Sequence, residues 1–401
     1  MRTKLRAALV TAAAALGLVA TSVVPAQAAT GFDRCPQGKF CVFDGADGQG
    51  AMASYSTPQR DLGAWRSKAS SVVNRTGYEQ LCLYSRTNYE YLDSVHDVMA
   101  GGPGSYGINL SDFADANSHL DNNLGSARWA HTVRECQGGT ESLDWSTPYG
   151  PTAGPAQSFG DLNRDGAPDL LHRSYAGRLW FLSGNSAGSL LGAGWNSMTA
   201  MTRHGDLNGD LNEDLLVRDT TGNLYMYPGN GNGSFGNRLP LGGGWNGMSR
   251  IQATGDLNGD GKGDLLARDT AGNLYTYPGN GKGSFGNRLL LGAGWNAMKS
   301  FAGPGDLNGD GRNDLVVSEN NGKLWLYPGN GRGGFGNRVM IGTGGWAAYD
   351  TLLGIGDYDQ DGHPDLLAVG GVVRVYRGLQ GGGLGEAETV SYNVENSDTL
   401  F

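Results

Sequence analysis

The feature of this sequence that most restricts its fold is an acidic loop that occurs five times. The copy at residues 255–264 reads GDLNGDGKGD, with oxygen-bearing side chains at positions 1, 3, 5 and 9 counted from Asp256. The five loops begin at positions 161, 206, 256, 306 and 357, so their spacings are 45, 50, 50 and 51 residues. A motif that returns at such a period indicates a repeat architecture with one loop in every repeat.

Each repeat also contains four short segments with strand character. In the third copy these are residues 250–254, 265–269, 274–277 and 288–291, separated by turns rich in glycine and asparagine. Four short strands at a period near 50 residues are typical of one blade of a β-propeller. Since each copy is expected to contain all four of its strands, the sequence predicts an all-β chain with a five-bladed propeller.

The loops also predict bound metal. Side-chain oxygens at positions 1, 3, 5 and 9, with a backbone carbonyl expected at position 7, are ligands that Ca²⁺ prefers. We therefore expect up to five calcium ions, which brace the blades. The predicted ligands are Asp161, Asn163, Asp165, Asp169, Asp206, Asn208, Asp210, Asp214, Asp256, Asn258, Asp260, Asp264, Asp306, Asn308, Asp310, Asp314, Asp357, Asp359, Asp361 and Asp365. Position 6 is glycine in four copies but Leu211 in the second, whose site is expected to be the weakest.

The first 28 residues have the pattern of a secretory signal peptide. Arg2, Lys4 and Arg6 precede an apolar run over residues 7–20, and the run Ala-Gln-Ala at residues 26–28 offers small residues for cleavage. No later stretch approaches the ~18 continuous apolar residues of a membrane span. We therefore predict a secreted, extracellular protein without membrane insertion.

The chain that follows the predicted signal peptide is acidic. Its net charge is 27 minus 39, or −12, which disfavours nucleic acid and anionic membranes as partners. The five loops hold 16 aspartates, three in each of the first four and four in the last. The acidity therefore reflects the predicted metal sites and indicates no particular partner.

The four cysteines all lie in the first third of the chain, at Cys35, Cys41, Cys82 and Cys136. In an exported protein they predict two disulfides, with three pairings open. The residues around Cys41 and those around Cys82 also form a weak duplication, each an alternating strand followed by a polar turn. Two such units predict a β-sandwich over residues 31–137. A glycine- and proline-rich linker over 138–157 and the propeller over 158–401 then follow.

Both regions resemble known families. The run CPQGKFC at residues 35–41, with its strand, resembles the βγ-crystallin-like family of the streptomycete metalloproteinase inhibitor. That resemblance implies a Greek-key sandwich with Cys35–Cys41 and Cys82–Cys136 disulfides, and inhibition of secreted metallopeptidases. The repeats resemble the FG-GAP/VCBS family, to which the integrin α-subunit propeller belongs, which implies calcium between the first two strands of each blade. Residues 66–71 and 122–127 only partly match the calcium signature of some βγ-crystallins, so we expect their serines to stabilise turns.

The sequence favours binding over catalysis. Residues 184–188 match the G-x-S-x-G pattern of serine hydrolases, but they align with a turn of the later repeats. The histidines form no H-E-x-x-H motif. We therefore predict a secreted non-catalytic protein that binds a secreted protein, such as a metallopeptidase. A hydrolase is the least favoured class.

A lectin that binds extracellular glycans is the alternative function. Aromatic side chains recur at equivalent places, where they would suit multivalent sugar binding or would fill the wedges between blades. The set that ends the fourth strand consists of Trp195, Trp245, Trp295 and Trp346. The set that lies in the third strand consists of Trp180, Tyr225, Tyr275 and Trp325.

Overall fold

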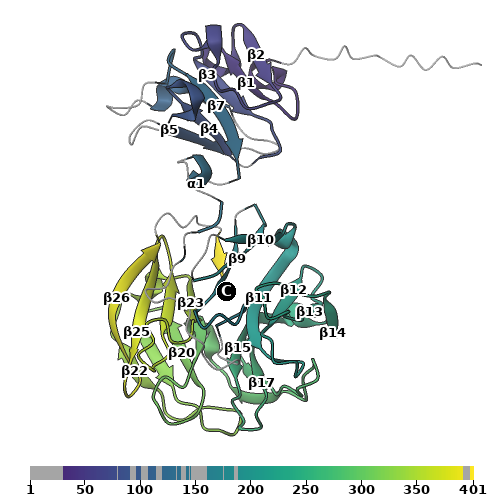
Figure 1. Cartoon of the computed structure of the whole chain (residues 1–401), viewed down its shortest axis with the longest axis vertical. Coiled ribbons are helices and arrows are strands. Elements are labelled where there is room, and N and C mark those ends of the chain that lie inside the picture. The colour runs from purple at the N-terminus through teal and green to yellow at the C-terminus, as the bar shows by residue number, and fades with distance from the viewer. Residues whose placement is uncertain are drawn as a thin grey trace, which may run out of the picture.

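The computed structural model describes residues 30–78, 80–90, 96–100, 107–113, 120–131, 133–136, 141–143, 145, 160–174, 176–184, 188–391 and 398–401. The predicted signal peptide lies outside these residues. Figure 1 shows a small β domain and, below it, a ring of sheets. Within the described ranges one turn of α-helix occurs, α1 (Val133–Cys136), and no helix is long and apolar enough to span a membrane. The fold is therefore all-β, as the sequence predicts.

The N-terminal domain consists of two sheets that exchange segments. Its strands are β1 (Phe40–Phe43), β2 (Met52–Tyr55), β3 (Ser71–Asn74), β4 (Gln80–Tyr84), β5 (His96–Ala100), β6 (Ile108–Asn109) and β7 (Ser126–Ala130). One sheet has the order β2-β1-β3-β6 and the other β5-β4-β7. Strand β6, from the second half of the domain, thus joins the sheet of the first half. Gln59 makes the reciprocal exchange by bridging to Ala127, which gives two interlocked Greek keys.

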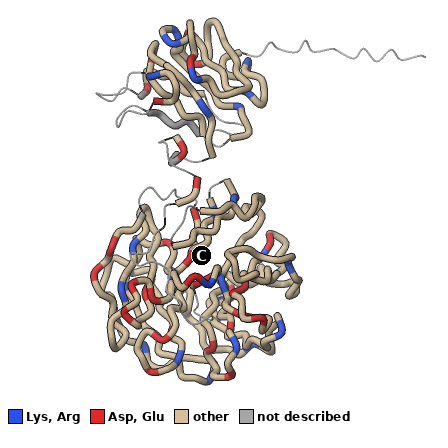
Figure 2. The backbone as a smooth tube through the Cα atoms, in the orientation of Figure 1, with Lys and Arg blue, Asp and Glu red and all other residues tan. Residues whose placement is uncertain are grey.

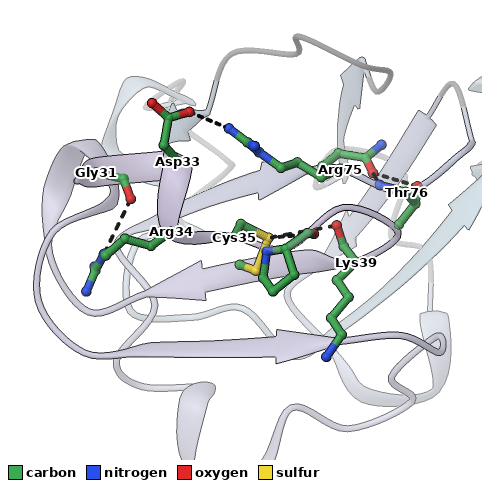
Figure 3. Close-up of a disulfide and its surroundings, with 10 residues drawn as sticks. Gly31, Asp33, Arg34, Cys35, Lys39, Arg75 and Thr76 are labelled. Carbon is green, nitrogen blue, oxygen red and sulfur yellow. Dashed lines mark hydrogen bonds and ion pairs between the residues drawn. A yellow bond between two sulfur atoms is a disulfide. The ribbon is translucent and has the colours of Figure 1, made fainter. Parts of the chain in front are cut away.

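The core of this domain lies between the two sheets. Phe40 and Val42 from β1 and Leu81 and Leu83 from β4 are fully buried there. The disulfides are Cys35–Cys41 and Cys82–Cys136, which confirms the pairing that the family resemblance implies. Figure 3 shows the surroundings of Cys35, where Arg75 pairs with Asp33 at 2.6 Å.

One serine in each half of the domain holds a folded turn. The Ser71 hydroxyl donates to the carbonyl of Gly45 (2.6 Å) and accepts the amide of Gly48 (3.1 Å). Ser126 makes the equivalent bonds to the carbonyl of Arg86 (2.6 Å) and the amide of Tyr89 (3.0 Å). These serines stabilise turns, as expected from the incomplete calcium signatures.

The second domain is a propeller of five four-stranded antiparallel sheets. Four blades follow the chain order. They comprise β11 (Met198–Gly205), β12 (Asp214–Asp219), β13 (Leu224–Tyr227) and β14 (Leu239–Gly242); β15 (Met248–Gly255), β16 (Asp264–Asp269), β17 (Leu274–Tyr277) and β18 (Leu289–Gly292); β19 (Met298–Gly305), β20 (Asp314–Glu319), β21 (Leu324–Tyr327) and β22 (Val339–Gly342); and β23 (Thr351–Gly354), β24 (Leu366–Val369), β25 (Val373–Leu379) and β26 (Gly383–Ser391).

The first blade differs from the prediction that each repeat contains all four of its strands. It consists of β8 (Leu170–Arg173), β9 (Leu179–Leu182), β10 (Ser189–Gly192) and, as its innermost strand, β27 (Thr399–Leu400). Thr399 pairs with Arg173, and the Phe401 amide donates to the Leu171 carbonyl at 2.9 Å. The two ends of the propeller thus meet in one sheet, because β27 satisfies the inner edge of β8. The C-terminus lies near the middle of the ring in Figure 1.

Arginines near the end of the second strand connect neighbouring blades. Arg268 Nη1 donates to the carbonyls of Trp295 (2.9 Å) and Met298 (2.7 Å), where the next blade begins. Arg173 and Arg218 occupy the equivalent positions of the first and second blades and make the same contacts. These arginines fix the position of each following inner strand.

Part of the predicted linker packs on the propeller. Trp145 Nε1 donates to the Pro168 carbonyl at 2.9 Å, and its ring lies 5.5 Å from that of Tyr358. Glu141 pairs with Arg178 at 2.8 Å, and Arg178 also contacts His131 of the N-terminal domain. The chain is therefore anchored beside the junction of the first and last blades.

Candidate functional site

The acidic loops connect the first and second strands in four blades, and in the first blade the loop directly precedes β8, the second strand. In the third loop, Asp256 Oδ1 accepts the Gly259 amide (2.6 Å) and Oδ2 accepts the Gly261 amide (2.7 Å). Asn258 Oδ1 accepts the Asp260 amide at 2.9 Å. The loop therefore wraps around the carboxylate at position 1, and the second and fourth loops repeat these bonds. Figure 2 shows acidic residues, in red, recurring around the propeller.

The aspartate at position 9 of each loop is completely buried. Asp264 Oδ2 accepts the Leu257 amide (3.1 Å), and Oδ1 accepts the Gly279 amide (2.9 Å) from the turn after the third strand. The five equivalent residues are Asp169, Asp214, Asp264, Asp314 and Asp365. Burial raises the pKa of Asp169 to about 8, that of Asp214 to about 7 and those of the other three to about 6. In the second to fifth loops this carboxyl group thus ties its loop to a second turn.

Two observations bear on whether these side chains fit a cation. In the fifth loop, carboxylate oxygens of Asp357, Asp359 and Asp361 all lie within 4.8 Å of one another. Asp169 Oδ1 and Asp359 Oδ1 are buried and have no hydrogen-bond partner among the described residues. Converging carboxylates and unpaired buried oxygens match the needs of a hard cation such as Ca²⁺, so the residues fit the predicted metal.

The second loop keeps the backbone path of the others despite its leucine. Leu211 has φ +70°, close to the +79° of Gly261 at the same position, and its side chain is 53% exposed. A left-handed conformation costs a residue with a Cβ about 1–2 kcal/mol. The leucine therefore strains the backbone of this loop and gains little burial in return.

Replacing Leu211 with glycine is expected to raise the free energy of unfolding by about 0.5–1 kcal/mol. The change relieves the backbone strain, but the greater conformational freedom of glycine in the unfolded chain offsets part of that gain. The reverse change, Gly261→Leu, is a matched control because a Cβ at Gly261 meets no atom within 4 Å. That change should destabilise by a similar amount. Thermal unfolding of both variants measures the effect, and a destabilised Leu211→Gly protein would contradict it.

The recurring tryptophans fill the wedges between blades. The Trp195 ring lies 5.2 Å from that of Tyr227 in the next blade, and Trp245 lies 4.9 Å from Tyr277. Trp295 and Trp346 make the same contacts with the blades that follow them. This arrangement supports the packing interpretation of these rings over a set of open platforms.

The aromatic residues of the third strands are mostly covered by arginines. Arg288 lies 4.2 Å from the centre of the Tyr275 ring, and Arg338 lies 3.9 Å from that of Trp325. Tyr225 is covered in the same way by Arg238 at 4.4 Å. Trp180 in the first blade packs instead against the hydrophobic cluster around Leu170.

The features that resembled catalytic motifs gain no support. Residues 185–187 of the G-x-S-x-G pattern lie outside the described residues. His204 is completely buried, and burial lowers its pKa to about 3, so its ring is neutral. His172 is buried beside Asp398 at 3.2 Å, in the strand pair that closes the ring.

Sequence reasoning missed a cluster of arginines at the centre of the ring. Arg173, Arg218 and Arg250 line one cavity there, although they belong to three different blades. The sequence places an arginine at the same repeat position three times, at Arg173, Arg218 and Arg268, and this recurrence could have indicated part of the cluster. Nothing in the repeat spacing indicates that Arg250 joins them.

Comparison with known proteins supports both domains. Residues 28–92 match the model of peptidase inhibitor family I36. Residues 206–267, 256–317 and 306–368 match the FG-GAP-like repeat model. No curated protein gives a significant match.

Several solved structures are similar in parts. A βγ-crystallin from Ciona intestinalis is 17% identical, with a TM-score of 0.19, and the match covers 23% of this chain and all of that one. A lectin of Agrocybe aegerita that recognises non-reducing terminal N-acetylglucosamine is 16% identical, with a TM-score of 0.37, over 92% of this chain and 95% of that one. The BP39L lectin from Burkholderia pseudomallei is 14% identical, with a TM-score of 0.39, over 58% and 68% of the two chains.

The matched family models point to the general class of non-catalytic binding proteins. Within this chain, an N-terminal β domain whose residues 28–92 match the I36 peptidase-inhibitor model precedes a propeller whose residues 206–368 match the FG-GAP-like repeat model.

Proposed function

We propose that the protein is secreted and that its N-terminal domain inhibits an extracellular metallopeptidase. The observation that carries this proposal is the match of residues 28–92 to peptidase inhibitor family I36. The Cys35–Cys41 and Cys82–Cys136 disulfides support an extracellular location, since such bonds persist in oxidising compartments.

The structure of this domain suits an inhibitor. A disulfide fixes each half of the sandwich, and Ser71 and Ser126 fix its two folded turns. A surface held in one conformation loses little entropy when it binds, which favours affinity.

The proposal predicts that the mature chain inhibits a secreted zinc metallopeptidase of the thermolysin type at near-equimolar concentration. A Cys82→Ala/Cys136→Ala variant should inhibit at least about tenfold less, because it loses a crosslink worth about 2–5 kcal/mol. Residual peptidase activity measures the inhibition, and a serine peptidase serves as control. Full peptidase activity in a large molar excess of the mature chain would reject the proposal.

We further propose that the five loops bind calcium and that the ions brace the propeller. The converging carboxylates of Asp357, Asp359 and Asp361 support this assignment. Bound calcium would add to the positive charge of Arg377, which pairs with Asp359 at 3.3 Å. Asp365 would hold the loop against the turn at Gly378 (2.6 Å). The role of the ion in this proposal is structural.

Glycan binding by the propeller is the second candidate. Trp195, Trp245 and Trp295 are only partly buried, so their edges reach the surface at equivalent places in three wedges. Several weak sites on one ring would bind a polymeric glycan through avidity. Retention of the mature chain on a glycan array, lost in a Trp245→Ala/Trp295→Ala variant that still inhibits the metallopeptidase, would support this function.

A further inference from the structure

The centre of the propeller contains a cavity that neither proposed function uses. Its volume is about 250 Å³, and it is lined by residues of the inner strands β11, β15, β23 and β27. Leu352, Leu353 and Leu400 provide apolar wall. Arg173, Arg218 and Arg250 add three guanidinium groups from three blades.

In the described part of the chain, these arginines donate to backbone carbonyls and not to carboxylates. Arg173 and Arg218 use Nη1 to donate to backbone carbonyls of the following blades. Arg250 Nη2 donates to the Lys299 carbonyl at 3.0 Å. Among the described residues, no carboxylate forms an ion pair with any of the three, and Arg173 Nε is buried without a partner. The cavity therefore holds positive charge that these contacts leave unbalanced.

Two other charged residues line the cavity. Arg203 forms a bidentate ion pair with Glu213. Its Nε and Nη2 each donate a hydrogen bond of 2.7 Å to the Glu213 carboxylate. The carboxylate of Phe401 accepts the Leu171 amide at 3.0 Å. Neither group neutralises Arg250.

Arg250 departs from the repeat pattern. The equivalent inner-strand positions in the second, fourth and fifth blades hold Ala200, Ser300 and Thr351, which are small enough for the crowded axis. Burial and the nearby charge of Arg268 lower the pKa of Arg250 to about 10. Arg250 is half-buried, and a charge held partly out of water without a counter-ion destabilises a fold, so its presence at this one position points to a ligand.

We propose that this cavity binds an oxyanion, a sulfate or a carboxylate, with Arg250 as the principal contact. A guanidinium group donates two parallel hydrogen bonds to such groups, and exclusion of water strengthens them. The volume lies below the range typical of drug-sized ligands, so the bound group is either a small inorganic anion or one acidic sugar residue.

Calorimetric titration of the calcium-loaded mature chain with sulfate, D-glucuronate and D-glucose at constant ionic strength tests this proposal. We expect one binding site per chain for at least one of the two anions and none for glucose. Tighter binding of glucuronate than of sulfate would identify a sugar acid as the ligand, and the reverse would identify an inorganic anion. The absence of binding by both anions would overturn the proposal.

Two variants locate the site. Arg250→Gln should weaken binding about tenfold to a hundredfold, the range expected for a hydrogen bond to a charged group. Arg288→Gln is the matched control, because Arg288 stacks on Tyr275 in the third strand of the same blade. Equal weakening by both would show a diffuse charge effect and reject the site. If Arg250→Gln fails to fold, Thr351→Phe, which fills the cavity without changing charge, must abolish binding, and unchanged binding would reject the site.

Discussion

Removing calcium with a chelator is expected to lower the Tm of the propeller by about 5–11 °C for each site. This range applies when the free calcium concentration before chelation is about 100 times the Kd of the site. A ligand at that concentration stabilises the folded state by about 2.7 kcal/mol, and 1 kcal/mol shifts the Tm of a domain of this size by about 2–4 °C. Because the disulfide-bearing domain contains none of the loops, its unfolding should be unchanged. Calorimetry with and without chelator separates the two transitions.

The effect of calcium should increase with pH. Without metal, burial raises the pKa of Asp169 to about 8 and that of Asp264 to about 6, above the ~3.9 of an unfolded aspartate. The folded chain then holds protons that the unfolded chain has released, so metal-free stability falls as the pH rises from about 4 towards 8. Calcium requires the ionised carboxylates and opposes this loss. The Tm difference caused by chelator should therefore be larger at about pH 8 than at about pH 5.

A single variant tests the assignment of the ligands. Asp361→Asn removes a negative charge from the carboxylate cluster of the fifth loop, and it should reduce the chelator effect without abolishing it.

Replacing calcium with magnesium should restore little of the stability, because Mg²⁺ retains its waters and demands a stricter geometry. If chelator leaves both transitions unchanged, the loops are turns and not metal sites.

Replacing Leu400 with alanine is expected to destabilise the propeller by about 2–5 kcal/mol, the usual cost of truncating a buried leucine. Leu400 is 1% exposed and packs with Leu170, Ile355 and Leu367 where the first and last blades meet. Strand β27 is short, so the lost packing should also weaken its pairing with β8. Denaturant unfolding measures the loss.

The matched control is Leu379→Ala, since Leu379 is 46% exposed in the last blade. This change should alter stability by less than about 0.5 kcal/mol, as surface substitutions do. Similar effects of the two variants would mean that β27 does not contribute to ring closure.

The propeller could be predicted because its information is local and repeated. Each loop, such as that at Asp256, is followed at short range by the strands that it connects, and five copies confirm one another. The pairing of Thr399 with Arg173 could not be predicted, because the two residues are 226 positions apart and the three last residues carry no repeat signal.

The same distinction separates the loops from the central cavity. Ligands such as Asp357, Asp359 and Asp361 lie within one turn, so their spacing in the sequence is sufficient to bring them together. Arg173, Arg218 and Arg250 meet only because three blades converge on one axis. Their proximity depends on the closed ring, which the spacing of residues within one repeat does not describe.

The strand exchange in the first blade also determines when the protein can finish folding. The blade that begins the propeller receives its innermost strand from Thr399 and Leu400, which are synthesised after every other strand of the described residues. Until these two residues are made, the inner edge of β8 has no partner strand and the apolar surface around Leu170 stays uncovered. A chain that lacks β27 would therefore be expected to keep an open ring.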